Sequence, residues 1–129
     1  MNSLIEDAKT ARSNAYASYS KFAVGAALEC ENGEIFRGCN VENISFGLTI
    51  CAERSAVSAA VAAGNTKFRR IAIVADTDEP ISPCGACRQV LAEFNPQLRI
   101  IAANLRDKSQ EFSLSELLPR PVTGILNRA

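Results

Sequence analysis

Apolar side chains recur at helical spacing in three stretches of the chain. In the first stretch they return every three or four residues after a capping box formed by Ser3 and Glu6. The second stretch is rich in alanine and is followed by Gly64, and the third has Ser82 as its expected N-cap and stops before Asn95. This pattern predicts helices over about residues 4–15, 51–63 and 83–94.

Short apolar runs rich in β-branched residues indicate strands beside these helices. Four such runs are found, at residues 22–30, 34–40, 70–75 and 98–103. The first two flank the turn sequence Glu31-Asn32-Gly33 and predict a hairpin, and the last two enclose the third helix as a β-α-β unit. A second capping box, Ser113 with Glu116, opens a short last helix. We therefore expect an α/β fold, a three-layer α-β-α sandwich around one mixed sheet.

The charge balance narrows the choice of partners. The 129 residues include 14 Lys plus Arg and 14 Asp plus Glu, so the formal net charge is zero and no basic run offers a footprint for nucleic acid. No apolar stretch approaches the roughly 18 residues of a membrane span, and the N-terminus is acidic where a signal peptide is basic and then apolar. We expect one domain over residues 1–129, cytoplasmic, with no nucleic-acid or membrane partner.

Three of the five cysteines fall in two short motifs, in a chain without histidine. Cys51 opens one predicted helix, and Cys84 and Cys87 lie one turn apart at the start of the next, where helix N-termini stabilise thiolates. A structural zinc site would need a fourth cysteine or histidine, but Cys30 and Cys39 lie in the hairpin without paired spacing. We therefore expect one catalytic zinc ion per subunit, held by the three motif cysteines, with water in the fourth position.

Glu53, in Cys51-Ala52-Glu53, is the expected proton carrier. Zinc lowers the pKa of a bound water to about 7, and a nearby carboxylate passes the water proton to the pyrimidine ring nitrogen and then to the leaving amine. Together with Pro83-Cys84-Gly85-Ala86-Cys87, this motif is typical of zinc nucleobase deaminases, with cysteine replacing the more common histidine. The sequence thus predicts hydrolytic deamination with Glu53 as the catalytic residue.

Longer segments of the chain resemble one family within this class. They are Gly38 to Asn43, Gly47 to Arg54 and Pro83 to Gln89. In these segments, and over about residues 15–119, the chain resembles the small, three-cysteine, homotetrameric cytidine deaminases. The resemblance implies zinc-dependent conversion of cytidine and deoxycytidine to uridine and deoxyuridine, with release of ammonia, for pyrimidine salvage by a homotetramer.

The resemblance also implies roles for residues around the substrate. The residue matching Phe22 packs on the pyrimidine, and those matching Asn40 and Glu42 hold the ribose hydroxyls. An aromatic face suits a flat base, and an amide and a carboxylate satisfy hydroxyls that are costly to bury unpaired. Ala52 is a further implied substrate contact. Arg54 is placed against the zinc thiolates, whose excess negative charge it would offset. Without the resemblance, Phe22 fits a core position and Arg54 an exposed helix position.

Two positions depart from the family pattern. Phe46 stands where the family usually has tyrosine, and Val122 stands where a phenylalanine usually reaches the site of a neighbouring subunit. Neither change touches the cysteines or Glu53. The reaction class is therefore expected to survive, and any difference is expected in affinity and substrate range.

Other functions fit parts of the sequence. A cysteine pair with two intervening residues is often redox-active, but that interpretation leaves Cys51 and Glu53 without a purpose. A polynucleotide deaminase would need basic and aromatic residues outside the pocket. A deaminase of a cytidine-like nucleoside antibiotic or analogue would differ mainly in the ribose-binding segment, where Asn40 and Glu42 favour the ordinary nucleoside. A zinc-stabilised binding module without activity is the remaining alternative.

Overall fold

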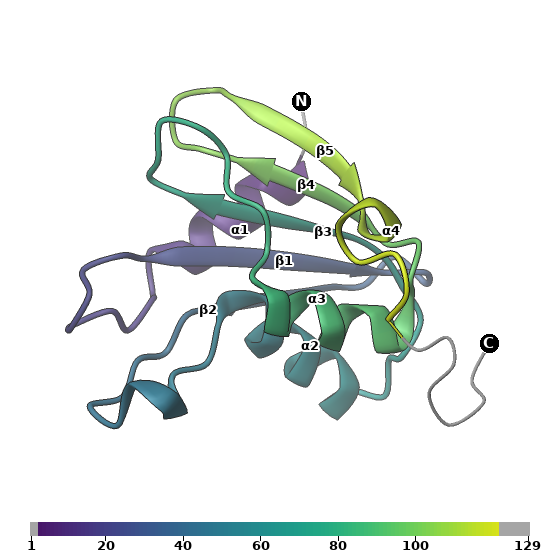
Figure 1. Ribbon diagram of the computed structural model, residues 1–129, viewed down its shortest axis with the longest axis horizontal. Helices are drawn as coiled ribbons and strands as arrows, with labels where there is room; N and C mark the ends of the chain where they lie inside the picture. The colour runs from purple at the N-terminus through teal and green to yellow at the C-terminus, as the bar shows by residue number, and fades with distance from the viewer. Residues whose placement is uncertain (1–2, 122–129) are drawn as a thin grey trace.

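A computed structural model describes residues 3–121, which form a five-stranded mixed sheet covered by helices on both faces (Figure 1). The strand order is β2-β1-β3-β4-β5; β3 and β4 are parallel and the other neighbours are antiparallel. The strands are β1 (Val24–Cys30), β2 (Ile35–Cys39), β3 (Phe68–Ala75), β4 (Arg99–Ala103) and β5 (Ser109–Ser113). The helices are α1 (Ser3–Arg12), α2 (Ala52–Ala62), α3 (Gly85–Phe94) and α4 (Leu114–Leu117), with a 3-10 turn η1 (Phe46–Leu48). The expected α-β-α sandwich is confirmed.

Alternate residues of the central strands face opposite helical layers. Ile71 and Ile73 of β3 belong to the core that contains the buried faces of α2 and α3, whereas Ala72 and Val74 pack with the buried face of α1. Figure 1 shows α2 and α3 together on one side of the sheet and α1 on the other. Because both faces of β3 are covered, its sequence is a nearly continuous apolar run rather than an alternating one.

Two glycines allow helices to lie close against the sheet. A Cβ atom at Gly38 of β2 would lie 2.4 Å from the carbonyl oxygen of Ala52 and 2.4 Å from the backbone nitrogen of Ala56. A Cβ atom at Gly25 of β1 would lie 2.0 Å from the carbonyl oxygen of Ala8 in α1. The bare backbone of Gly38 therefore sets how closely the first turns of α2 approach β2.

Several boundaries differ from the sequence-based expectation. Strand β5 was not predicted, because its residues are polar and largely exposed at the edge of the sheet. The N-cap of α3 is Cys84 and not Ser82, and the first bond of this helix runs from the Arg88 N–H to the Cys84 carbonyl at 2.9 Å. Helix α1 ends at Arg12, and β1 starts at Val24. The capping box of Ser113 with Glu116 is confirmed at the start of α4.

Within residues 3–121, no helix has the length and apolar character needed to cross a bilayer. Val122 lies outside the described residues, so its expected effect on a neighbouring subunit stays a prediction.

Candidate active site

The starts of α2 and α3 bring three cysteines together. Cys51 is the N-cap of α2 and Cys84 the N-cap of α3, and Cys87 follows in the first turn of α3. The Sγ atom of Cys84 lies 3.9 Å from that of Cys51 and 3.4 Å from that of Cys87. Helix α3 follows β3, so the cluster lies outside the carboxyl ends of the parallel strands, the usual place for a site in an open α/β sheet.

The cluster fits a zinc ion. Tetrahedral zinc with Zn–S bonds of about 2.3 Å would hold its sulfur ligands about 3.8 Å apart. The three sulfur atoms here all lie within 4.8 Å of one another, and in residues 3–121 no carboxylate or further cysteine joins them. The chain also has no histidine. Three protein ligands with one position left over are typical of a catalytic zinc site rather than a structural one.

Burial and hydrogen bonding act differently on the thiols. Burial raises the pKa of Cys84, but the backbone and side-chain hydrogen bonds with Cys87 and the hydrogen bond with Cys51 outweigh it, and the net pKa is lowered. Burial raises the pKa of Cys87, and the charge of Glu53 adds to this shift. A buried thiol of raised pKa becomes a thiolate only where a cation compensates its charge, which is a demand that a bound metal ion meets.

A pocket of about 250 Å³ opens beside the cysteine cluster. Its walls come from four separate segments of the chain, residues 22–24, 40, 49–53 and 81–84. The lining residues are Phe22, Val24, Asn40, Thr49, Cys51, Ala52, Glu53, Ile81, Ser82 and Cys84. The structure thus brings two of the motif cysteines, Glu53 and three of the four predicted substrate-binding residues to one cavity. A second pocket, of about 370 Å³ between α1 and the β4–β5 side of the sheet, contains none of these residues.

Glu53 lies in the first turn of α2 and is 5% exposed. Burial raises the pKa of its carboxyl group, and its own backbone amide, the charge of Arg54 and the thiol of Cys87 oppose this shift only in part. A raised pKa makes a carboxylate a better proton acceptor near neutral pH. Glu53 is therefore a buried carboxyl group of raised pKa in the pocket wall, and its predicted role as proton carrier stays a prediction.

Arg54 turns from α2 toward the cysteines. One terminal guanidinium nitrogen lies 3.6 Å from the Sγ of Cys51 and 3.4 Å from the carbonyl oxygen of Thr49. The Nε atom of Arg54 is buried without a hydrogen-bond partner among the described residues. The hydrogen bond to Cys51 raises the pKa of the guanidinium against the effect of burial. Arg54 is consequently a contact of the sulfur cluster and not a solvated helix residue.

Asn40 and Glu42 brace the loop that carries Phe22. The Asn40 amide donates to the Phe22 carbonyl at 2.8 Å, and its oxygen accepts the Val24 N–H at 2.9 Å. The Glu42 carboxylate accepts the N–H groups of two loop residues at 2.9 and 3.0 Å, and the hydroxyl of Ser20. Asn40 lines the pocket, whereas Glu42 is not among the lining residues. The predicted contacts of Asn40 and Glu42 with ribose stay predictions. In the structure, both side chains hold the loop before β1 in place.

Residues 1–103 match the family described as "Cytidine and deoxycytidylate deaminase zinc-binding region". The chain belongs to this family. It is 50% identical over 117 residues to the cytidine deaminase of Sporosarcina psychrophila, a match that covers 90% of this chain and 86% of the relative. It is also 50% identical over 122 residues to that of Halalkalibacterium halodurans, covering 94% and 92%.

Solved structures agree with the family assignment. The crystal structure of cytidine deaminase from Burkholderia pseudomallei is 50% identical, superimposes with a TM-score of 0.89, and covers 93% of this chain and 98% of that one. The predicted deaminase class and zinc cofactor are thereby confirmed, as is the resemblance seen in the sequence. The roles of individual residues are not tested by these similarities.

Two features of this family member's site were not predicted from the sequence. Ile81 and Ser82 form a wall of the pocket just before Cys84, and Thr49 forms another part. Arg88 holds this wall by donating to the Pro83 carbonyl at 2.7 Å and to the Ser82 hydroxyl at 3.1 Å. Nearness to Cys84 was a signal for Ile81 and Ser82. The hydrogen bonds of Arg88 to the residues before α3 could not be predicted, because no pattern of apolar and polar positions indicates them.

Proposed function

We propose that this pocket converts cytidine and deoxycytidine to uridine and deoxyuridine with release of ammonia, using one zinc ion held by Cys51, Cys84 and Cys87. The observation that carries the proposal is the placement of three sulfur atoms within 4.8 Å of one another, with the buried Glu53 in the same pocket wall as two of them. When bound, zinc supplies a water molecule of lowered pKa.

Glu53 moves the protons of this reaction. Its carboxylate takes a proton from the attacking water and delivers it to N3 of the pyrimidine as the water oxygen bonds to C4. It then passes the remaining hydroxyl proton to the exocyclic amine, the C4–N bond breaks, and ammonia leaves. Water and the amine thus exchange places on C4 with no net change in protonation of Glu53. The raised pKa of Glu53 suits both halves of this shuttle.

The pocket offers a matching surface to a nucleoside. Phe22 is 42% exposed and lines the pocket, so its ring is available to pack against a flat base. Ala52 lines the pocket beside Glu53, and Asn40, whose proposed partner is the ribose, lines it as well. Among residues 3–121, no lining residue is lysine or arginine, so this part of the chain gives the pocket no side-chain cation to neutralise a phosphate. These contents favour nucleosides over nucleotides.

The loop of residues 43–50 supports assembly into a homotetramer. It carries apolar side chains that are exposed in the single chain: Ile44 at 78%, Phe46 at 62% and Leu48 at 66%. Contiguous exposed apolar surface is typical of subunit interfaces. Because Thr49 of this loop and Cys51 directly after it line the pocket, a subunit that covers this loop would lie beside the active site. We propose that the protein acts in the cytoplasm, in pyrimidine salvage.

The test combines activity with metal content. The purified protein should deaminate cytidine, followed by its loss of ultraviolet absorbance, and hold close to one zinc per subunit. Glu53→Gln should keep the zinc and lose at least about a hundredfold in kcat, because an amide cannot carry the proton. Cys87→Ala is the matched control, in which zinc itself should be lost. Full zinc in Cys87→Ala, or substantial turnover by Glu53→Gln, would contradict the assignment.

A further inference from the structure

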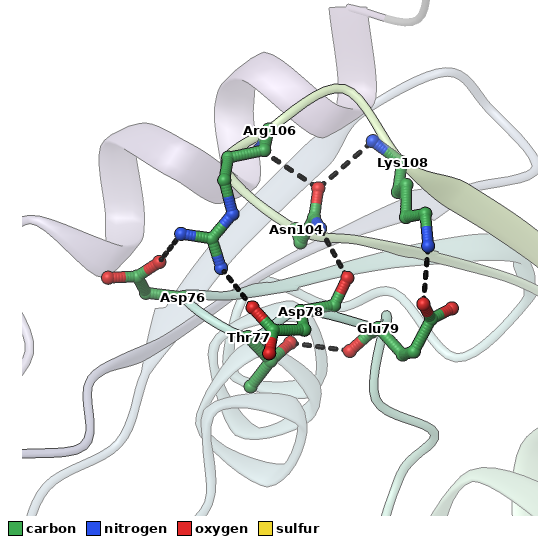
Figure 2. Close-up of polar contacts among 7 residues, drawn as sticks. All are labelled: Asp76, Thr77, Asp78, Glu79, Asn104, Arg106 and Lys108. Atoms are coloured by element: carbon green, nitrogen blue, oxygen red, sulfur yellow. Dashed lines mark hydrogen bonds and ion pairs between the residues drawn. The ribbon is translucent and has the colours of Figure 1, made fainter.

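A buried asparagine outside the active-site pocket joins the two loops that follow the carboxyl ends of β3 and β4. Asn104 directly follows β4 and is 2% exposed. Its side-chain oxygen accepts the backbone N–H groups of Arg106 and Lys108, both at 2.9 Å. Its side-chain nitrogen donates to the backbone carbonyl of Asp78 at 2.9 Å, in the loop that follows β3 (Figure 2). The amide thus closes the β4–β5 turn and grips the β3–α3 loop.

Ion pairs surround this amide on the solvent side. Arg106 pairs with Asp76 at 3.4 Å and with Asp78 at 3.2 Å, and Lys108 pairs with Glu79 (Figure 2). All of these charged side chains are at least half exposed, and exposed pairs contribute little stability individually. The hydrogen bond from the buried Asn104 side chain to the Asp78 carbonyl is therefore the stronger part of the link between the two loops.

The gripped loop leads directly to the pocket wall. Only residues 80–83 separate Glu79 from Cys84, and two of them, Pro80 and Pro83, have fixed φ angles. Ile81 and Ser82 between the prolines line the pocket. A stiff segment of this length carries a displacement at one end through to the other. Arg88 holds its far end, so without the hydrogen bond from Asn104 only the exposed ion pairs of Asp78 and Glu79 would hold the near end.

We propose that Asn104 is a positioning residue of the active site. Through Asp78 it fixes the segment that presents Ile81 and Ser82 to the substrate and Cys84 to the metal. This inference rests on the proposed role of Cys84 as a zinc ligand. Asn104 touches neither the pocket nor the cysteines, so it acts through the loop and not on the reacting atoms.

Asn95 provides a matched control at the opposite end of the strands, near the start of β3. Its side-chain nitrogen donates to the Phe68 carbonyl at 2.9 Å, and its oxygen accepts the Gln97 N–H at 2.9 Å. It therefore makes the same kinds of bond, a turn closure and a grip on another segment, at the carboxyl end of α3 and the start of β3. Replacing it costs similar hydrogen bonds without touching the loop before Cys84.

The experiment compares alanine and aspartate at positions 104 and 95 in the zinc-loaded enzyme. Zinc release is followed by its transfer to a chromogenic chelator, together with KM and kcat for cytidine and unfolding in urea. We expect Asn104→Ala to release zinc about tenfold faster than wild type, the change that corresponds to about 1.4 kcal/mol, and to raise KM. Asn95→Ala should change zinc release and KM by less than about twofold at a similar loss of stability.

Asn104→Asp separates the hydrogen bond to Asp78 from the hydrogen bonds that close the β4–β5 turn. Aspartate keeps an oxygen for the N–H groups of Arg106 and Lys108 but lacks the donor to Asp78, so it should release zinc nearly as fast as Asn104→Ala. It also decides the matter where the alanine variant does not fold. Zinc release and KM equal to wild type in a folded Asn104→Asp enzyme would overturn this inference alone. A wild-type enzyme without zinc would overturn the metal site, and this inference with it.

Discussion

Replacing Gly38 by alanine tests how strictly the sheet positions the metal centre. The added Cβ atom would lie 2.4 Å from the Ala52 carbonyl oxygen, whereas contacts of a real Cβ begin between 3.0 and 3.4 Å. Helix α2 must then move off the sheet by about 0.6–1 Å, since both close contacts are with its backbone and no side chain can yield. Helix α3 has no such contact with Gly38 and is not pushed.

This movement separates the candidate ligands. The sulfur atoms of Cys51 and Cys84 now lie 3.9 Å apart. A displacement of Cys51 with α2 by about 0.6–1 Å would take this separation to as much as about 4.5–4.9 Å, beyond the roughly 3.8 Å that tetrahedral zinc sets. We expect Gly38→Ala to lose about 1–3 kcal/mol of stability from overpacking and about ten- to a hundredfold in zinc affinity.

Gly25→Ala is the matched control for this experiment. Its Cβ would lie 2.0 Å from the Ala8 carbonyl oxygen, so it overpacks the sheet against α1 on the opposite face. It should lower the urea midpoint at least as much as Gly38→Ala while the folded fraction keeps its zinc. Zinc content is measured by elemental analysis after dialysis against a weak chelator. A folded Gly38→Ala enzyme with wild-type zinc affinity and kcat/KM would refute the argument that Gly38 sets the position of α2.

Three further predictions concern the pocket and its supports. Arg54→Gln should lower kcat more than zinc content, because it removes a cation from the thiolates, and Arg54→Lys should restore only part of the rate; an unchanged rate and pH profile in Arg54→Gln would count against this. Cytidine 5′-monophosphate should have a kcat/KM at least about a hundredfold below that of cytidine in parallel absorbance assays, since none of the lining residues that the structure describes is cationic, and comparable values would contradict the nucleoside assignment. The pKa of Glu42 is lowered, chiefly by the Ser20 hydroxyl, so its stabilising effect is present above the ordinary carboxyl pKa and is lost as the pH falls through the lowered value. Urea titrations should show this acid loss in wild type and not in Glu42→Gln, and equal acid sensitivity of both would contradict it.

Local signals in the sequence predicted most of the fold and the chemical centre. Within each motif the spacing places the residues at one helix start, Cys51 with Glu53 and Cys84 with Cys87, and the fold around β3 then brings the two helix starts together. The hairpin and the β-α-β unit have turn and apolar patterns of their own, whereas β5 has neither and forms only because β4 offers it an edge.

Long-range hydrogen bonds explain what the sequence could not predict. Glu42 lies 23 residues from the Tyr19 N–H that it accepts, and Asn104 lies 26 residues from Asp78. Such partners depend on how loops fold back over the sheet, and no periodic pattern encodes them. For the same reason Ser82 was wrongly expected to cap α3: it fits the local preference for an N-cap, but α3 begins only at Gly85, and the Ser82 hydroxyl accepts a hydrogen bond from Arg88.

The joining of two helix N-caps also bears on how the chain unfolds. Cys51 and Cys84 are 33 residues apart in sequence, and all of β3 lies between them. An ion bound to both closes this stretch into a ring, which restricts the unfolded chain much as a covalent crosslink does. For a ring of this length the loop-closure entropy corresponds to about 3–4 kcal/mol, provided that the crosslink persists on unfolding. The cysteines that hold the metal for hydrolysis would thus also crosslink the chain on either side of β3, the central strand of the sheet.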